Sequence, residues 1–235
     1  MTAGESSGDG VSGDDGRPDP CACDTVLVHE VVGTIQGEGP EQGYPICLER
    51  LTGCNLRCAY CDSTRAYFEG RRRPIAELVD EIASAAIPRI LVTGGEPLCQ
   101  GGTPALCGAL LAAGHRVSIE TNGTRDLTAL PRGVRRVVDV KTPGSGENGS
   151  FRMSNLDALR EGDALKFVLT GGEDFRWALR WLKVHTPPGG AQVLLSPAWG
   201  VLPPEDLAEM LLKHRPDARL QVQLHKILWG DRPGV

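Results

Sequence analysis

Three cysteines stand close together at a spacing that could hold a metal centre. Cys54, Cys58 and Cys61 form the pattern CxxxCxxC. A structural zinc site needs four ligands, and neither a further cysteine at a fitting spacing nor a nearby histidine completes such a set. A cluster of four irons held by three thiolates instead leaves one iron open to a chelating substrate. A structural zinc loop or a chance grouping of thiols is the alternative.

Four polar motifs each follow a strand-like segment of the chain. They are the three cysteines, Gly94-Gly95-Glu96-Pro97, Thr121-Asn122-Gly123 and Lys141, which follow residues 46–51, 89–93, 117–120 and 134–140 respectively. The carboxyl ends of parallel strands meet at one edge of a sheet or barrel, where functional residues gather. The sequence therefore predicts one site built from all four motifs.

Strand-like and helix-like segments alternate along most of the chain, which predicts the fold class. Apolar, often β-branched runs predict strands at residues 25–32, 46–51, 89–93, 117–120, 134–140, 165–169, 193–195 and 220–224. Helical spacing of apolar residues predicts helices at 75–86, 104–113, 173–184 and 204–214, and glycines predict a turn over residues 33–40. Such alternation is typical of an α/β fold with a parallel sheet, either doubly wound and open or a partial barrel.

Composition and charge exclude several classes of protein. The 235 residues carry a net charge of −5, of which −4 belongs to the first 20 residues, so no bulk attraction to nucleic acid is expected. The sequence contains no run of about 18 apolar residues and no secretion signal. We expect a cytoplasmic protein whose clustered thiols bind metal. Residues 1–22 are expected to form a disordered acidic leader, and residues 23–235 one folded domain.

The cysteine pattern resembles that of the radical S-adenosylmethionine (SAM) superfamily, in which an aromatic residue precedes the last cysteine, as Tyr60 does here. The resemblance implies that the three thiolates hold a 4Fe–4S cluster whose fourth iron is chelated by SAM. One electron from the cluster would then cleave SAM to methionine and a 5′-deoxyadenosyl radical. Residues 23–235 are accordingly expected to form the catalytic domain. The SAM-binding residues implied are Tyr60, Asp62, Gly94, Gly95, Glu96, Ser118, Glu120, Asn122, Lys141 and Ser145.

Four segments resemble the 7-carboxy-7-deazaguanine synthase family within that superfamily. They are GTIQGEGP at residues 33–40, RLTGC at 50–54, TGGEPL at 93–98 and QLHKILWG at 223–230. The resemblance implies conversion of 6-carboxytetrahydropterin to 7-carboxy-7-deazaguanine with loss of ammonia, a lyase step toward queuosine-type 7-deazapurines. It also implies an abbreviated partial (β/α) barrel, a homodimer, and an electron donor such as flavodoxin or ferredoxin.

The same resemblance implies a set of substrate contacts. Arg50 would hold the substrate carboxylate in a bidentate fork, and Gln36 and Glu38 would offer acceptors to the pterin N–H groups. Ser63 stands where the family more often has a threonine that binds Mg²⁺, and its hydroxyl keeps the hard oxygen ligand. The substrate-binding residues implied are Ile35, Gln36, Gly37, Glu38, Arg50, Thr93 and His225.

Other interpretations of these residues stay open on the sequence alone. Arg50 could be a surface charge on an edge strand, Glu38 a solvated turn residue, and Glu120 a local cap. A glycyl-radical activating enzyme is a second radical SAM function, although it needs a groove for a protein backbone. A non-catalytic zinc or iron–sulfur module is a third.

Overall fold

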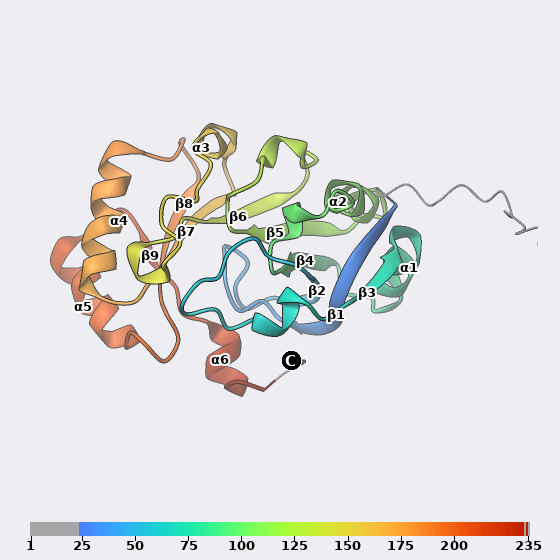
Figure 1. The fold of residues 1–235 in the computed structure, drawn as a ribbon, viewed down its shortest axis with the longest axis horizontal. Helices are drawn as coiled ribbons and strands as arrows, with labels where there is room; N and C mark the ends of the chain where they lie inside the picture. Colours follow the sequence, from blue (N-terminus) through green and yellow to red (C-terminus); the bar gives the residue numbers. More distant parts are fainter. Residues whose placement is uncertain (1–23, 233, 235) are drawn as a thin grey trace, which may run out of the picture.

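The structure is a computed structural model that describes residues 24–232 and residue 234. The predicted leader, residues 1–22, lies outside the described residues. Nine strands of the described chain form one open, curved sheet in the order β3-β1-β2-β4-β5-β6-β7-β8-β9 (Figure 1). The strands are β1 Thr25–Ile35, β2 Pro45–Leu51, β3 Arg71–Pro74, β4 Arg89–Gly94, β5 Arg116–Thr121, β6 Arg135–Asp139, β7 Ala164–Leu169, β8 Gln192–Pro197 and β9 Arg219–Leu220.

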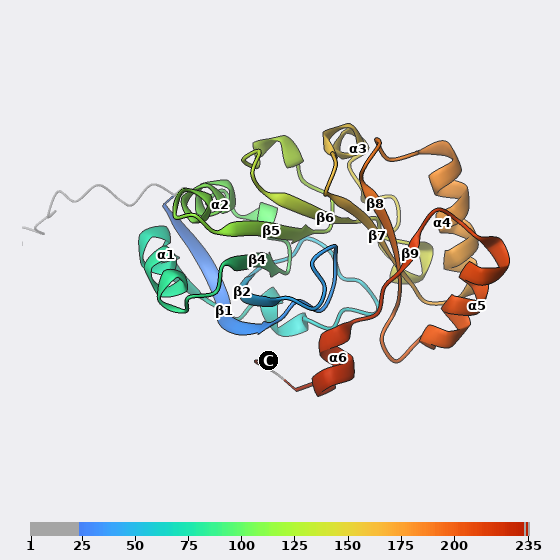
Figure 2. The same cartoon turned by 180° about the vertical axis from the view of Figure 1, so that it is seen from behind.

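The direction of the strands divides the sheet into two parts. All neighbouring pairs from β2 to β9 are parallel, whereas β1 pairs antiparallel with both β2 and β3. The helices are α1 Ile75–Ser84, α2 Thr103–Ala112, α3 Ser154–Ala158, α4 Gly172–Val184, α5 Pro204–His214 and α6 Leu224–Trp229. Figures 1 and 2 show α1 to α5 along the outer side of the sheet and α6 apart from them. This is the predicted α/β fold, in its partial-barrel form.

Side-chain alternation along the strands separates an apolar outer layer from a polar inner face. On β4, Ile90 and Val92 are fully buried in the core beneath the helices, whereas Leu91 and Thr93 line a cavity on the inner face. Because successive side chains of a strand point to opposite faces, one short apolar strand serves both the core and the site. None of the described helices is long and apolar enough to cross a membrane.

Two predicted elements differ in the structure. Residues 33–35, expected in a turn, continue β1, because they pair with residues 45–47 of β2. The strand predicted at residues 220–224 is reduced to Leu220 of β9, and Leu224 already begins α6. The side-chain oxygen of Gln221, Oε1, accepts a hydrogen bond from the Gly39 amide (2.6 Å). The polar residues of the alternating LQVQL pattern therefore contact the loop after β1 and do not mark the exposed face of a strand. β3, α3 and α6 were not predicted.

Glu49 is a buried carboxyl that the alternation of β2 directs into the apolar outer layer. It is 0% exposed, and neither carboxyl oxygen has a hydrogen-bond partner among the described residues. Burial raises the pKa of Glu49 from 4.5 to about 7, with Arg73 opposing and Glu81 adding to the shift. The folded state therefore holds this proton more tightly than the unfolded state does.

We expect the Glu49→Met variant to lose this pH dependence of stability. In the natural chain, stability is fully present below pH 4.5 and falls as the pH rises through about 7, because the unfolded state ionises first. The loss amounts to about 3 kcal/mol. Urea unfolding at pH 5 and pH 8 measures it, with Glu173→Gln, an exposed carboxyl on α4, as the control. An equal fall in both variants would show that Glu49 is not the group responsible.

Candidate active site

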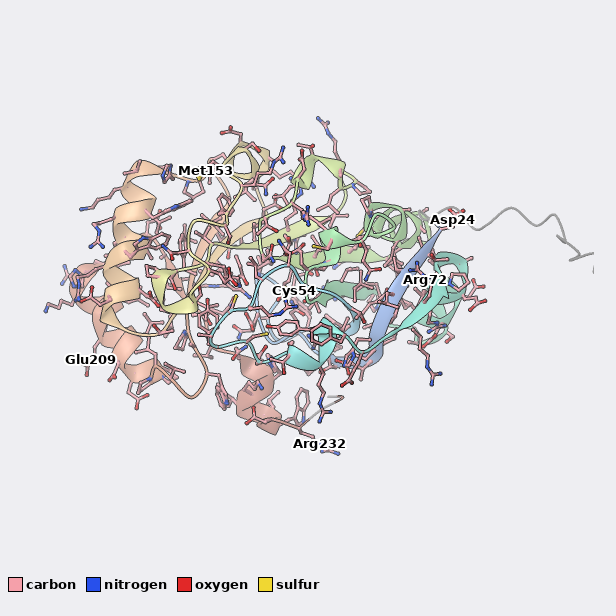
Figure 3. The ribbon with its side chains drawn as sticks, viewed as in Figure 1. Asp24, Cys54, Arg72, Met153, Glu209 and Arg232 are labelled. Carbon is pink, nitrogen blue, oxygen red and sulfur yellow. The ribbon has the colours of Figure 1, made fainter. Side chains whose placement is uncertain are left out.

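A cavity of about 600 Å³ lies on the inner face of the sheet, within the usual size range of small-molecule sites. It is lined by the ends of the parallel strands, the loop after β1 and residues 54–63, here called the cysteine segment. Figure 3 shows Cys54 near the centre of the molecule. The four polar motifs therefore meet at one place, as predicted.

The cysteine segment is held in place largely through its backbone. The Cys61 amide donates to the Cys58 carbonyl (3.1 Å), and the Leu56 amide donates to Cys54 Sγ (3.5 Å). The Ala59 amide donates to the carbonyl of Ser145 (2.9 Å), which ties the segment to the loop after β6. Burial raises the pKa of the Cys54 and Cys58 thiols, so metal binding would displace their protons.

The three cysteines supply the donor set of a possible metal centre. Cys54, Cys58 and Cys61 are free thiols and all line the cavity. A structural zinc site needs four protein ligands, whereas three thiolates are enough for a 4Fe–4S cluster that keeps one iron open. The number and type of these ligands therefore suit an iron–sulfur cluster.

Two glycines bring the end of β4 against the start of the cysteine segment. Gly94 has φ +145°, and a Cβ there would overlap the backbone of Leu51. At Gly95 a Cβ would overlap the Gly53 carbonyl and the Cys54 side chain. Backbone bonds complete the junction, from the Gly95 amide to the Leu51 carbonyl (3.1 Å) and from the Glu96 amide to the Gly53 carbonyl (2.7 Å). The glycine pair thus permits a close approach that no side chain would allow.

Three residues implied as SAM contacts are buried away from the cavity lining. The carboxylate of Glu96 accepts from the Leu98 amide (2.9 Å), the Thr121 hydroxyl (2.7 Å) and the Asn122 amide (2.6 Å). Ser118 donates to the Ile90 carbonyl (3.1 Å), and Ser145 to the Thr142 carbonyl (2.6 Å). These side chains join neighbouring segments. The other site residues implied by the resemblance all line the cavity.

Arg50 lies inside the sheet, since β2 has neighbours on both sides. Its Nε is 2.6 Å from Glu30 Oε1 on β1, and its Nη1 donates to Ser63 Oγ (3.2 Å). Ser63 in turn donates to Asp62 Oδ1 (3.0 Å). These contacts orient the guanidinium toward the cavity and leave Nη2 without a bond among the described residues. Because β2 is an interior strand, the alternative that Arg50 is a surface charge on an edge strand is wrong.

The loop after β1 supplies the opposite wall. Gln36 is 2% exposed, and its Oε1 has no hydrogen-bond partner in the described part of the chain. The Glu38 carboxylate accepts from Lys166 (2.6 Å) and from Gln223 (2.8 Å), so Glu38 is not a solvated turn residue. A buried amide oxygen without a partner is costly, which indicates that a ligand supplies the missing donor.

Charged side chains from three adjacent strands meet beneath this wall. The carboxylates of Glu120 and Asp139 face the ammonium groups of Lys141 and Lys166. Burial raises the pKa of Glu120 to about 7, although Lys166 opposes the shift. Burial would also raise the pKa of Asp139, but Lys141 and Lys166 lower it below its usual value. The pKa values of these two neighbouring carboxyls are therefore shifted in opposite directions.

Two ring side chains complete the wall near the cysteines and the C-terminal segment. Burial raises the pKa of Tyr60 to about 12, and its hydroxyl has no partner among the described residues. The ring of His225 lies against Gly37, where a Cβ would overlap it. Burial lowers the pKa of His225, with Glu38 opposing, so the imidazole is neutral at pH 7. Gly37 thus leaves room for this ring beside the cavity.

Several lining residues were not predicted from the sequence. Lys166 interrupts the otherwise apolar strand β7, and this interruption was the available signal. The segment Ser196–Trp199 spans the end of β8 and the two residues after it, at the same edge of the sheet as the other motifs, a position that also could have been recognised. Tyr67 and Gln223 also line the cavity, and Gln223 bonds Glu38 and Asp62, which are far from it in sequence. Glu30 does not line the cavity itself but holds Arg50 from β1.

Known proteins share both the sequence pattern and the fold. The radical SAM superfamily profile matches residues 48–141. A 7-carboxy-7-deazaguanine synthase from Koribacter versatilis is 38% identical over 217 residues, covering 86% of this chain and 96% of the relative. One from Methanospirillum hungatei is 35% identical and covers 97% and 95%. The crystal structure of QueE from Escherichia coli superposes with a TM-score of 0.71 at 21% identity, covering 85% of this chain and 94% of that one.

Proposed function

Because the chain belongs to the 7-carboxy-7-deazaguanine synthase family, we propose that it converts 6-carboxytetrahydropterin to 7-carboxy-7-deazaguanine with loss of ammonia. The observation that carries this proposal is the composition of one cavity. It joins three free thiols to Arg50, Gln36 and Glu38, which suit a small substrate bearing a carboxylate and a donor-rich ring. Its volume of about 600 Å³ is in the usual range of small-molecule sites.

The cysteines and the carboxyl edge of the sheet would hold the two cofactors. Cys54, Cys58 and Cys61 would ligate a 4Fe–4S cluster, which three free thiols on one cavity wall suit. When bound, the cluster and SAM supply the one-electron chemistry that starts the ring contraction. The residues that would contact SAM line the same cavity and include Tyr60, Asp62, Gly94, Gly95, Glu120, Asn122 and Lys141.

The buried polar groups that are not on the cavity wall would act on SAM indirectly. Glu96 fixes the loop after β5 through its bonds to Thr121 and the Asn122 amide. The backbone carbonyl of Ser145 accepts a hydrogen bond from the Ala59 amide of the cysteine segment. Ser118 joins β5 to β4 through the Ile90 carbonyl. We therefore assign to Glu96, Ser118 and Ser145 the placement of the SAM-binding backbone.

The substrate would be oriented by a fork at one end and acceptors at the other. The free Nη2 of Arg50, beside the Nη1 bonded to Ser63, suits a carboxylate. Gln36 Oε1 and the Glu38 carboxylate suit the ring amino and lactam N–H groups, and Thr93, Ile35, Gly37 and His225 complete the wall. With both ends held, the protein's contribution is positioning and exclusion of water from a reactive intermediate.

Product analysis tests this function directly. Anaerobically reconstituted enzyme with SAM, a reductant and 6-carboxytetrahydropterin should release 7-carboxy-7-deazaguanine and ammonia, detected by mass spectrometry. A glycyl-radical activating enzyme would cleave SAM without consuming the pterin. Zinc in place of iron, together with no SAM cleavage, would instead indicate a non-catalytic module.

We further propose that Ser63 is the protein ligand of a Mg²⁺ ion that also binds the substrate carboxylate. The Ser63 hydroxyl is bonded to both Arg50 and Asp62, so a hydroxyl oxygen and a carboxylate oxygen, the hard ligands that Mg²⁺ prefers, lie side by side. The positive charge of Arg50 favours binding of the substrate carboxylate at the same place. The bound ion would add its charge to that of Arg50 in holding the substrate.

Activity should rise with added Mg²⁺ in the natural enzyme, and Ser63→Ala should lower it by about tenfold and weaken that response. Ser63→Thr, which keeps the hydroxyl, is the matched control and should retain the response. Turnover measured against Mg²⁺ concentration compares the three proteins. A Ser63→Ala enzyme with an unchanged Mg²⁺ response would reject the assignment.

Three features of the protein's setting are also proposed from family membership. We propose a homodimer, a small one-electron donor such as flavodoxin or ferredoxin, and a cytoplasmic location. The six cysteines of the described chain are all free thiols, which suits a reducing compartment. The product would enter 7-deazapurine synthesis of the queuosine type.

A further inference from the structure

Lys166 places a positive charge in the middle of the parallel sheet. It belongs to β7, between Leu165 and Phe167, which are both fully buried. The lysine side chain is only 5% exposed and points to the inner face, opposite to those neighbours. An ammonium group is costly to remove from water unless charged partners surround it.

Three carboxylates from three different elements surround the ammonium group. Lys166 Nζ is 2.6 Å from Glu38 Oε2, 3.3 Å from Asp139 Oδ1 and 3.6 Å from Glu120 Oε2. Glu38 belongs to the loop after β1, whereas Glu120 and Asp139 belong to β5 and β6. Lys141 makes a more limited contact, with Asp139 Oδ2 at 2.8 Å. Lys166 therefore links the substrate loop to the strands beneath it.

The contacts of Glu38 define where a ligand could bind to it. An ionised carboxylate has about four acceptor positions. Lys166 (2.6 Å) and Gln221 (3.3 Å) occupy Oε2, and Gln223 (2.8 Å) occupies one position on Oε1. One position on Oε1 is then left for a further donor. With the carboxylate fixed by three bonds, that position has a defined direction.

We propose that Lys166 is a positioning residue for substrate selection: by holding Glu38 Oε2, it presents Oε1 as an acceptor for an N–H group of the pterin ring. This inference rests on the proposed function and adds a residue that acts through Glu38 without touching the substrate. Without Lys166, Glu38 Oε2 would lose its nearest charged partner while Asp139 and Glu120 stay close to it, so repulsion would turn the carboxylate away from its present direction.

The other charged and titratable groups around Glu38 define what the test must separate. They are Glu120 on β5, Asp139 and Lys141 at the end of β6, Arg50 on β2, Asp62 in the cysteine segment, and His225 and Lys226 on α6. Several of these groups belong to the proposed SAM side of the cavity. A general loss of charge balance would therefore weaken SAM binding as well, whereas loss of Glu38 positioning would weaken only pterin binding.

Binding of 6-carboxypterin, a stable oxidised analogue of the proposed substrate, provides the test. Its Kd and that of SAM would be measured on anaerobically reconstituted enzyme, by pterin fluorescence and by equilibrium dialysis. Lys166→Met should weaken carboxypterin binding roughly 10- to 100-fold and change SAM binding by less than about threefold. Lys183→Met, the same substitution at an exposed lysine of α4, should change neither. Unchanged carboxypterin binding, or equal weakening of both ligands, would overturn the inference.

A double variant keeps the test valid if Lys166→Met does not fold. Glu38→Gln combined with Lys166→Met removes one negative and one positive charge together. If Lys166 acts through Glu38, this variant should bind carboxypterin as the Glu38→Gln variant does, within about threefold. A further loss of more than about tenfold would contradict it. Failure of the natural enzyme itself to bind carboxypterin would instead refute the proposed function.

Discussion

Replacing Cys58 with alanine is expected to abolish the cluster and SAM cleavage together. Reconstituted natural enzyme should contain about four irons per chain with the absorbance of an iron–sulfur cluster. With two thiolates left, the variant should lose most of its iron and fall in SAM cleavage by on the order of 10³-fold or more. Iron analysis, absorbance spectra and 5′-deoxyadenosine formation measure the outcome.

Cys99 is the matched control for this substitution. It is an exposed free thiol and does not line the cavity. Cys99→Ala should therefore retain iron content and SAM cleavage near those of the natural enzyme. Turnover that survives in Cys58→Ala would show that the three thiolates are not the ligands of a catalytic cluster. Equal losses in both variants would point to general thiol damage.

Replacing Arg50 with lysine is expected to lower kcat/KM for the proposed substrate, 6-carboxytetrahydropterin, by roughly 10²- to 10⁴-fold. Lysine keeps the charge but loses the planar fork, and with it the simultaneous bonds to Glu30 and Ser63. Losing about two charge-assisted hydrogen bonds accounts for a change of this size. Steady-state kinetics with quantified product measure it, and SAM affinity should stay unchanged.

Arg73→Lys tests whether such a loss is particular to the cavity. The Arg73 guanidinium pairs with Glu81 of α1 at 2.6 Å and does not line the cavity. This exposed pair should be worth little, so the kinetics should stay within about twofold of the natural enzyme. An Arg50→Lys enzyme that performs equally well would mean that Arg50 does not hold the substrate carboxylate.

The sequence predicted most of the fold because local patterns reflect local physics. Each buried strand of the parallel part is a short apolar run, and the longer helices α1, α2, α4 and α5 have apolar positions at helical spacing. Failures occurred where distant contacts decide the conformation. Residues 221–223 alternate like a strand, yet the side chains of Gln221 and Gln223 bond Gly39 and Glu38, about 180 residues earlier.

The sequence by itself predicted the ligands of the proposed cluster. Cys54, Cys58 and Cys61 lie within eight residues, so their spacing alone specifies a set of three thiolates. The resemblance to the synthase family implied that Arg50, Gln36 and Glu38 contact a small polar substrate. The order of the strands was needed to show that all of these side chains line one cavity.

Only the tertiary structure decided which polar residues face the ligands and which support them. Glu96 belongs to a glycine-rich motif typical of a ligand site, yet its carboxylate bonds three donors within the protein. Lys166 carries no motif, and it meets Glu38, 128 positions away, because β7 lies beside β6 and the loop after β1 reaches the same edge. The spacing of residues along the chain predicts which side chains lie close together when they are also close in sequence. For charges that are far apart in sequence, strand order and register decide which of them are buried together.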